Sequence, residues 1–392
     1  MTDGALSRVG IAGSGKMGAD LFLYLMDHDF SLSWLCLDET EAQKATAAFR
    51  SRLERKTAFG EIGEEARRRV EGSTVIGCKP ECLAGCDLVI EAIPEDRDLK
   101  AGLFLALDAA VGKECVLTSN SSSILPSRIC PPGRGERFAG LHFFYPVRLK
   151  AVVELIAPSA CGAAAVGLIK DFVTRIGKIP LVLSEEGGFI LNRVFLDFQA
   201  QAYRILEEGR LDIEEIDGLV RESLFPVGVF EFLDAVGIDV ILNAVREYTR
   251  DDPVRRAFCR PWLRRMEGMV ATGSLGMKSG KGFYLYVGKR RKGVAVHVLP
   301  PWGERISTAP GYDDECREKL TALYLNAVLG AVEKGYAPAA ELDFAVRDYI
   351  GPQKGPLSLA QEMGREKLHT RLLCLLADTG EEVFRPAFII AA

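Results

Sequence analysis

The sequence predicts a doubly wound α/β domain, followed by an all-α domain that is present in two tandem copies. Short apolar runs alternate with helical stretches over residues 1–185, as they do in such a sheet domain. After Gly187 and Gly188 the strand pattern stops and long helical patterns begin. Within the helical part, a set of residues is repeated at a constant spacing, which indicates a duplication.

Apolar runs mark the strands of the first domain. The run Arg8–Ile11 leads into a glycine-rich turn, and apolar residues at helical spacing then predict a helix over 16–27. A second strand over 32–37 ends at Asp38. Later strands are expected at Leu88–Ile90, Cys115–Leu117, Phe138–Phe144, Val152–Ile156 and Ile179–Leu183.

The charged stretch Phe49–Glu71 separates the second strand from the third. It is rich in Arg, Lys and Glu. Such a composition is typical of a solvated helical surface. We therefore expect an exposed helical excursion here and not an element of the core.

The helical part is the region in which residues recur 126 positions later. The repeated residues are Gly209, Asp217, Val220, Arg221 and Pro226, which return as Gly335, Asp343, Val346, Arg347 and Pro352. Gly237 matches Gly364 with one residue inserted. We therefore expect one helical domain over 186–287 and a second, degenerate one over 313–392, joined by a linker over 288–312. The basic run at the start of this linker, Lys289–Lys292, leaves nuclear targeting as an alternative use.

Composition and charge exclude several classes of protein. Lys and Arg number 49 and Asp and Glu 54, a net charge of −5, which gives no general electrostatic reason to bind nucleic acid or an anionic membrane. No apolar run approaches the ~18 residues that span a bilayer, and the N-terminus lacks the pattern of a signal peptide. We therefore expect a soluble cytoplasmic protein whose ten cysteines are reduced.

Three of the cysteines raise the question of a metal site, because Cys78, Cys82 and Cys86 recur every four residues. Zinc sites usually combine such spacing with a second pair of cysteines or with histidines. No histidine lies near these three in the sequence, so we expect no metal.

The glycine-rich turn after the first strand has the spacing of a dinucleotide-binding site. Gly13 permits the tight turn, Gly15 lets backbone N–H groups approach a pyrophosphate, and Gly18 permits contact between helix and sheet. Asp38 ends the next strand 20 residues after Gly18, where a carboxylate accepts hydrogen bonds from the adenosine ribose and repels a 2′-phosphate. The sequence therefore predicts a Rossmann-type domain that binds NAD. The residues expected to contact it here are Gly13, Gly15, Lys16, Met17, Gly18 and Asp38.

A histidine and a glutamate form the candidate catalytic pair. His142 lies where the strand Phe138–Phe144 ends, and Glu154 interrupts the apolar run Val152–Ile156. A carboxylate inside a buried strand is costly unless it is paired, and an imidazole on the next strand would be a sufficient partner. Such a pair can abstract a proton from an alcohol, because the imidazole takes the proton and the carboxylate stabilises the imidazolium.

Two further polar features lie where a substrate could be held. The run Ser119–Ser123 follows a strand at the edge of the sheet where such domains bind ligands, although such runs are also common as turns and helix caps. Asn192 lies near the start of the first long helical stretch, where its amide is either an interdomain hydrogen bond or part of a cleft.

Taken together, these motifs resemble the NAD-dependent 3-hydroxyacyl-CoA dehydrogenase family of fatty-acid β-oxidation. The resemblance covers essentially the whole chain. It depends on the glycine motif and on Glu91–Glu95 with Lys100, Ser119–Ser122, His142–Phe144 with Glu154, Gly188–Arg193, Phe225–Gly228 and Gly280–Tyr284.

The resemblance implies that His142 is the catalytic base and Glu154 its orienting partner. It implies that Ser122 and Asn192 position the 3-oxygen and the imidazole, and that Glu95 and Lys100 contact NAD, with Asn120 beside them. The charged excursion would correspond to the helical tail of the family that meets coenzyme A. Lys56 or Arg52 would then contact the CoA phosphates.

The duplicated helices resemble the dehydrogenase part of the multifunctional β-oxidation enzymes. In those enzymes the second copy packs on the first much as two subunits do in the shorter dimeric members. Here Glu318 stands where the second copy would carry the equivalent of Asn192, so we expect that copy to be structural. The resemblance leaves both a monomer and a homodimer open.

Three departures from the family pattern concern the site. Tyr145 stands where the family usually has Asn, next to the catalytic loop, and is expected to line the acyl pocket. The run Arg148–Ala151 also differs from the family, and Lys16 adds a charge to the phosphate turn. None of the three removes a catalytic group.

The expected reaction is oxidation of an (S)-3-hydroxyacyl-CoA thioester to the 3-oxoacyl-CoA with NAD. Two alternatives stay open at this point. One is a dehydrogenase of a hydroxy acid without CoA, or of a carrier-bound thioester. The other is a nucleotide-binding scaffold without turnover, which retention of Ser122, His142, Glu154 and Asn192 disfavours.

Overall fold

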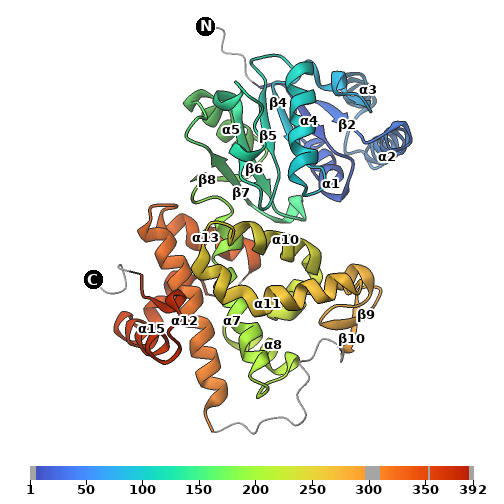
Figure 1. The fold of residues 1–392 in the computed structure, drawn as a ribbon. Helices are drawn as coiled ribbons and strands as arrows, with labels where there is room; N and C mark the ends of the chain where they lie inside the picture. Colours follow the sequence, from blue (N-terminus) through green and yellow to red (C-terminus); the bar gives the residue numbers. More distant parts are fainter. Residues whose placement is uncertain (1–5, 296–309, 352–353, 388–392) are drawn as a thin grey trace. The chain divides into compact units, whose positions relative to one another are not determined.

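The computed structural model describes residues 6–295, 310–351 and 354–387. Contacts between residues divide the chain into two units, 1–188 and 189–392 (Figure 1).

The first unit is built on an eight-stranded sheet in which β3 (Val75–Gly77) forms one edge. The strand order is β3-β2-β1-β4-β5-β6-β7-β8, and every neighbouring pair is parallel except β6 and β7, which are antiparallel. The other strands are β1 (Arg8–Ala12), β2 (Ser31–Leu35), β4 (Leu88–Glu91), β5 (Val116–Ser119), β6 (Phe138–Phe143), β7 (Val152–Ala157) and β8 (Ile179–Ser184). The order reverses direction next to β1, so the predicted doubly wound sheet is confirmed.

Two apolar clusters pack against this sheet, one for each group of helices. The larger contains side chains of α1 (Lys16–Leu25), α2 (Glu39–Ala58) and α5 (Ala163–Arg175), and the other contains those of α4 (Arg97–Ala110). Strand residues alternate between them, as Ile11 and Ala12 do. Because helices cover the sheet in this way, most of its strands are apolar, and their positions can be predicted from the sequence. The edge strand β3 has no buried residue and was not predicted.

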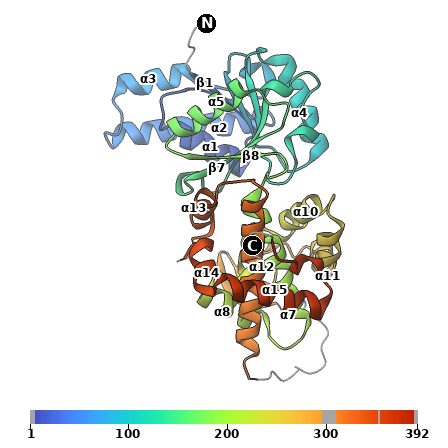
Figure 2. The ribbon, with the colours of Figure 1, turned by 90° about the vertical axis from the view of Figure 1, so that its left-hand side faces the viewer.

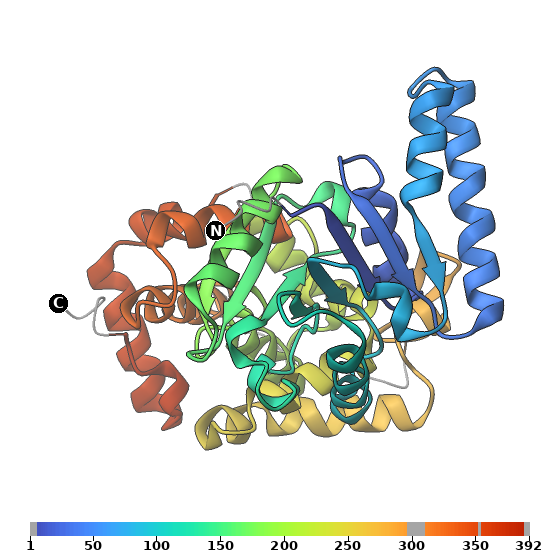
Figure 3. The same cartoon turned by 90° about the horizontal axis from the view of Figure 1, so that it is seen from above.

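The charged stretch expected to be an exposed excursion consists of α2 and α3 (Glu64–Ser73), which lie side by side beyond the edge of the sheet (Figures 2 and 3). The expectation is wrong for one face of α2. Phe49 and Leu53 are buried in the core, and the Phe49 ring lies edge-on to Phe22 with centroids 5.8 Å apart. It holds for α3, which has no buried residue. Only two side chains in this stretch of the helix turn inward, so the composition of the stretch conceals them.

In its described residues, the second unit is helical apart from one small hairpin. Its helices are α6 (Ile190–Arg193), α7 (Leu196–Glu207), α8 (Ile213–Ser223), α9 (Val229–Val236), α10 (Ile238–Tyr248), α11 (Pro253–Ala271), α12 (Tyr312–Glu333), α13 (Ala339–Ile350), α14 (Pro356–Met363) and α15 (Arg365–Thr379). Helix α12 packs along α7 (Figure 1). No helix among the described residues is both long and apolar enough to cross a membrane.

The segment expected to be a linker begins with a strand instead. Residues 290–294 form β10 (Arg290–Val294), which pairs antiparallel with β9 (Tyr284–Val287). The basic run that raised nuclear targeting therefore lies largely on an edge strand. Residues 296–309 of the expected linker lie outside the described residues.

The close contact of Gly18 with the glycine turn gives a prediction for stability. A Cβ atom on Gly18 would lie 2.1 Å from the Gly13 carbonyl oxygen, whereas one on Gly15 would meet no atom within 4 Å. We expect Gly18→Ala to lower the free energy of unfolding by about 1–3 kcal/mol, the usual cost of overpacking. Gly15→Ala is the matched control and should leave stability unchanged. Urea unfolding followed by circular dichroism measures both, and equal midpoints for the two variants would contradict the packing argument.

Candidate active site

The predicted dinucleotide turn joins β1 to α1 in the way that the glycine spacing requires. Gly13 has φ +126°, a conformation that favours glycine, and a Cβ there would lie 2.6 Å from the Ala92 carbonyl oxygen. The Trp34 indole donates to the Gly13 carbonyl at 2.8 Å. The space around Gly15 is open, and the N-terminus of α1 has neither a side-chain cap nor an acidic residue in its first turn. These features fit a pyrophosphate group, which needs backbone N–H groups and close approach.

Asp38 follows β2 and begins α2. Its Oδ1 accepts a hydrogen bond from the Glu41 backbone N–H at 2.8 Å, so the residue is the N-cap of the helix. The side chain is exposed. Capping one oxygen orients the carboxylate and leaves the other available for a ribose hydroxyl.

Two of the departures from the family pattern meet in the structure. The Lys16 ammonium lies 3.8 Å from the centre of the Tyr145 ring, a cation–π contact between the start of α1 and the loop after β6. One turn further along α1, Asp20 accepts the Val147 backbone N–H at 2.7 Å. The loop that follows His142 is therefore attached to α1 at two points.

His142 and Glu154 are direct partners across β6 and β7. The antiparallel register sets them opposite each other, and Nδ1 of the imidazole lies 2.7 Å from the Glu154 carboxylate. Both side chains are buried, Glu154 completely. The Phe144 ring lies 4.4 Å from the imidazole, centre to centre. Because Nδ1 faces the carboxylate, the tautomer with a proton on Nδ1 leaves Nε2 as the basic nitrogen.

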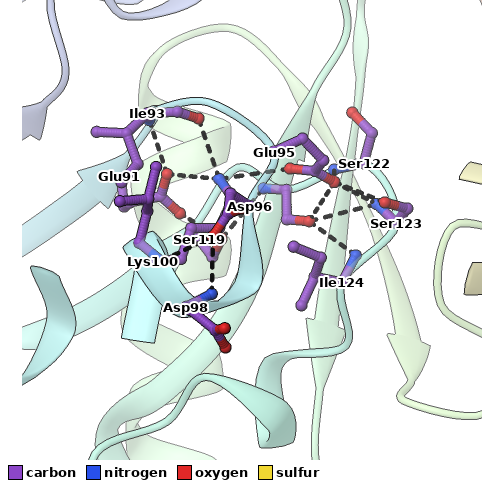
Figure 4. A network of polar contacts seen from close by, with 12 residues as sticks. Glu91, Ile93, Glu95, Asp96, Asp98, Lys100, Ser119, Ser122, Ser123 and Ile124 are labelled. Carbon is purple, nitrogen blue, oxygen red and sulfur yellow. Dashed lines mark hydrogen bonds and ion pairs between the residues drawn. The ribbon is translucent and has the colours of Figure 1, made fainter. Parts of the chain in front are cut away.

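A buried ion pair joins Glu91, at the end of β4, to Lys100 on α4, and Figure 4 shows its surroundings. Glu91 is completely buried and lies beside Ser119 in the register of β4 and β5. Its carboxylate accepts hydrogen bonds from the Lys100 ammonium at 2.6 Å, the Ser119 hydroxyl at 2.6 Å and the Ile93 N–H at 2.7 Å. Burial raises the pKa of Glu91, and the Lys100 charge opposes this.

Lys100 connects this pair to the serine turn. It lies 3.4 Å from the second oxygen of Glu95. The Glu95 Oε1 atom accepts the Ser122 and Ser123 N–H groups at 2.9 Å each, and the hydroxyls of Ser121 and Ser123 at 2.6 and 2.7 Å (Figure 4). Burial alone would raise the pKa of Glu95, but Lys100 and the serine hydrogen bonds outweigh it and lower the pKa. The turn that carries Ser122 is thus held by an ionised carboxylate.

Asn120 ties the same turn to the strand that carries His142. Its Oδ1 accepts the Phe143 backbone N–H at 2.8 Å. The serine turn and the imidazole are therefore neighbours at one edge of the sheet. This is the edge at the carboxyl ends of β1, β4, β5 and β6, where open α/β sheets bind ligands.

Lys100 has a different environment from the one expected of a residue that contacts a cofactor. Its side chain is 1% exposed, and its ammonium faces Glu91, Glu95 and the Ile93 carbonyl. Glu95 retains more exposure, 27% of its side chain. In the first unit, Glu95 is thus the more accessible of the two.

The cations expected to meet coenzyme A converge on one carboxylate. Asp27, just after α1, forms ion pairs with Lys56, Arg52 and Arg148. Burial would raise the pKa of Asp27, but these cations lower it. Three positive charges around one negative charge leave the cluster with a net positive charge.

Asn192 lies in the second unit, in the short helix α6. The residue before this helix, Phe189, has a left-handed backbone with φ +57°. The Asn192 amide nitrogen donates to the Tyr248 hydroxyl at 3.1 Å, and its oxygen accepts from the Tyr349 hydroxyl at 2.9 Å.

The cysteines that suggested a metal do not form a ligand set. Within the described parts of the chain, no three His, Cys, Asp or Glu side chains are grouped so that they could hold a metal ion. Burial raises the pKa of Cys82 to about 12 and that of Cys86 to about 11.

Sequence reasoning assigned no role to Glu91, Asp27 or Tyr349. Glu91 could have been recognised from the sequence, because it directly follows the apolar run Leu88–Ile90. In the same way, Glu154 interrupts the apolar run Val152–Ile156. A buried acid implies a buried partner in both cases. Asp27 and Tyr349 could not have been recognised in this way, because their partners lie far away in the sequence.

The comparisons with known proteins identify the family. The model of the NAD binding domain of 3-hydroxyacyl-CoA dehydrogenase matches residues 8–186, and the model of its C-terminal domain matches residues 188–286. The chain belongs to the 3-hydroxyacyl-CoA dehydrogenase family. As a member it is an NAD-dependent dehydrogenase of 3-hydroxyacyl-CoA thioesters, and the resemblance drawn from the sequence is confirmed.

Individual relatives differ in how much of the chain they match. The chain is 32% identical over 292 residues to a 3-hydroxybutyryl-CoA dehydrogenase of Bradyrhizobium diazoefficiens, a match that covers 73% of this chain and 97% of the relative. It is 26% identical over 458 residues to a 3-hydroxyadipyl-CoA dehydrogenase of Escherichia coli, covering 97% and 96%. A solved 3-hydroxybutyryl-CoA dehydrogenase of Escherichia coli has the same fold, with a TM-score of 0.80, 24% identity and 98% of both chains covered.

The buried pair of Glu91 and Lys100 gives a prediction for stability. We expect Lys100→Met to lower the free energy of unfolding by about 3–5 kcal/mol, because it leaves a buried carboxylate without its cation. Replacing both partners, with Glu91→Leu added, should recover part of that loss. Lys113→Met, at a lysine 80% exposed, is the control and should have no effect. Urea unfolding measures all three, and a Lys100→Met midpoint equal to wild type would refute the assignment of a charged pair.

Proposed function

We propose that His142 is the general base of this dehydrogenase and that Glu154 orients it. The observation that carries the proposal is the 2.7 Å contact between Nδ1 and a completely buried carboxylate. With Nδ1 bonded to Glu154, the imidazole accepts the proton of the substrate 3-hydroxyl on Nε2. Glu154 then stabilises the imidazolium, and in the reverse reduction the same proton returns to the 3-oxygen.

Ser122 and Asn192 are proposed to hold the 3-oxygen. The Ser122 backbone is fixed by Glu95, so its hydroxyl starts from a defined turn, and preorganised donors cost little reorganisation during the reaction. Bound NAD supplies the acceptor for the hydride that leaves C3. The protein contributes orientation and the base.

The proposed NAD site combines the glycine turn, Lys16, Met17, Asp38 and the turn after β5. The N–H groups at the start of α1 and the Lys16 ammonium would meet the pyrophosphate, and Asp38 the ribose hydroxyls. Glu95 and Asn120 complete the site from the neighbouring strands. We assign Lys100 an indirect part, through Glu95, because its ammonium is buried among acceptors.

The cluster around Asp27 is proposed to bind the phosphates of coenzyme A. Lys56 and Arg52 come from α2 and Arg148 from the loop after β6, so Asp27 brings cations of two segments together. Holding them in place in advance reduces the entropy lost when a phosphate binds.

The helices of the second unit are proposed to be two tandem copies. Equivalent contacts support this: Asp217 accepts the Phe230 N–H at 2.9 Å, and Asp343 accepts the Leu357 N–H at 2.8 Å. In each half a glycine lies against that carboxylate so closely that a Cβ would clash with it, and a glycine with positive φ separates the next two helices. These glycines are Gly228 with Gly237 and Gly355 with Gly364.

The contact between the proposed copies bears on assembly. Helix α12 packs along α7, and the rings of Tyr324 and Phe195 stack between them with centroids 5.6 Å apart. A surface covered within the chain is not available to a second chain. We therefore propose a monomer, with the homodimer as the alternative. The cytoplasmic location expected from the sequence stays a prediction.

The acyl group is proposed to belong to the short 3-hydroxyacyl-CoA thioesters. The two relatives described above are named for 3-hydroxybutyryl-CoA and for 3-hydroxyadipyl-CoA, and the second acyl group is longer and ends in a carboxylate. We propose that Tyr145, which is half exposed and contacts Lys16, determines which of these two acyl groups is accepted. A hydroxy acid without CoA stays the alternative that the experiments below address.

Removal of the base tests the mechanism. We expect His142→Gln to lower turnover of acetoacetyl-CoA with NADH by ~10²–10⁴-fold, the usual contribution of a general base, while NADH binding is retained. Oxidation of NADH followed optically measures the rate, with NADPH as the cofactor control and His369→Gln, on α15, as the control variant. An unchanged rate would rule out the assignment, and absence of wild-type turnover with any thioester would favour the scaffold.

The CoA cluster gives a separate prediction. We expect Lys56→Ala to raise KM for acetoacetyl-CoA about three- to tenfold, since one charge-assisted hydrogen bond to a phosphate is lost. KM for the acetoacetyl thioester of N-acetylcysteamine, which has no phosphate, should not change. Lys44→Ala, at an exposed lysine of the same helix, is the control. Equal effects on both thioesters would show that Lys56 acts on the fold and not on CoA.

A further inference from the structure

The Asn192 amide is held at both ends by tyrosine hydroxyls from different parts of the second unit. Tyr248 lies at the end of α10, within the region that the family models match, and receives a hydrogen bond from the amide nitrogen. Tyr349 lies in α13, beyond residue 286, and donates to the amide oxygen. The C-terminal helices therefore supply one of the two contacts of this side chain.

Helix α6 is too short to orient Asn192 by itself. It has four residues, and a single helical turn is unfavourable without tertiary contacts. The terminal torsion of an asparagine side chain is also broad, so the amide needs partners to fix its direction. Contacts between α6 and α13 and the two hydroxyls provide them.

The Tyr349 ring is itself held in place. Its centre lies 5.9 Å from that of Phe195 and 6.4 Å from that of Phe232, which meets it edge-on. Aromatic contacts of this kind restrain a ring to one orientation. The hydroxyl that donates to Asn192 is thus fixed by packing inside the second unit.

We propose that Tyr349 is a positioning residue for catalysis and acts through Asn192. An amide group has two N–H donors and one oxygen acceptor. Tyr349 occupies the oxygen and Tyr248 takes one N–H, which leaves the other N–H to donate to the 3-oxygen of the substrate. The inference rests on the role proposed above for Asn192. It gives the C-terminal helices a part in the reaction, although they carry Glu318 where an asparagine would be repeated.

The test compares Tyr349→Phe with a matched tyrosine in the same helical interface. We expect Tyr349→Phe to lower kcat for acetoacetyl-CoA about two- to tenfold, the range that one hydrogen bond supplies, while the Kd of NADH measured by fluorescence stays constant. Tyr248→Phe should act in the same direction. Tyr312→Phe removes the hydroxyl contact of α12 with Glu208 and should leave kcat unchanged.

The variant Asn192→Ala distinguishes positioning from general loss of structure. In that background, Tyr349→Phe should cause no further fall in kcat, because two residues that act as a unit are not additive. The same fall in both backgrounds, or no fall in the wild-type background, would overturn the inference. A wild type that binds NADH but turns over no 3-oxoacyl-CoA would overturn the proposed function together with this role, and the wild-type rate separates the two results.

Discussion

The hydrogen bond between His142 and Glu154 requires a carboxylate inside the sheet, and such a group is stable only when a partner lies beside it. The antiparallel register of β6 and β7 supplies that partner, because it sets the two residues opposite each other. The parallel register of β4 and β5 does the same for Glu91 and Ser119. A shift of either register by one residue would turn these side chains to the other face of the sheet and leave acids buried without partners. The fold and the candidate site are therefore stabilised by the same strand pairing.

The electrostatics of the site follow from this arrangement. Lys100 is buried between two carboxylates and neutralises part of their charge, so that Glu95 can stay ionised and hold the serine turn. The serine turn also contacts β6, because Asn120 accepts a hydrogen bond from the Phe143 backbone N–H. The backbone position of Ser122 is thus set by Glu95 and, through it, by the buried Lys100. This is the usual way in which a rigid scaffold preorganises the polar groups of a site.

In the second unit too, a predicted site residue is oriented by residues of other elements. Asn192 lies on a helix of one turn, and tyrosines of two longer helices determine how its amide is oriented. Only one of these helices falls within the region matched by the C-terminal family model. The added helices, which the sequence suggested to be structural, are in direct contact with a predicted functional side chain. The helices beyond residue 286 therefore contribute a contact to a side chain that is predicted to be functional, although the C-terminal family model does not match them.

The sequence alone predicted seven of the eight strands of the first unit, the glycine turn and the pairing of His142 with Glu154, but not the edge strand β3. Buried strands consist mostly of apolar residues, so they can be recognised in the sequence. A buried acid needs a buried partner, and the glycine spacing is typical of a strand–turn–helix unit. The inner face of α2, the strand β10 inside the expected linker and the burial of Lys100 were decided only by tertiary structure. So were the contacts of Asp27 with Arg148 and of Asn192 with Tyr349. In the last two contacts the partners are more than a hundred residues apart. No local sequence pattern shows which two side chains the packing of the elements will bring together.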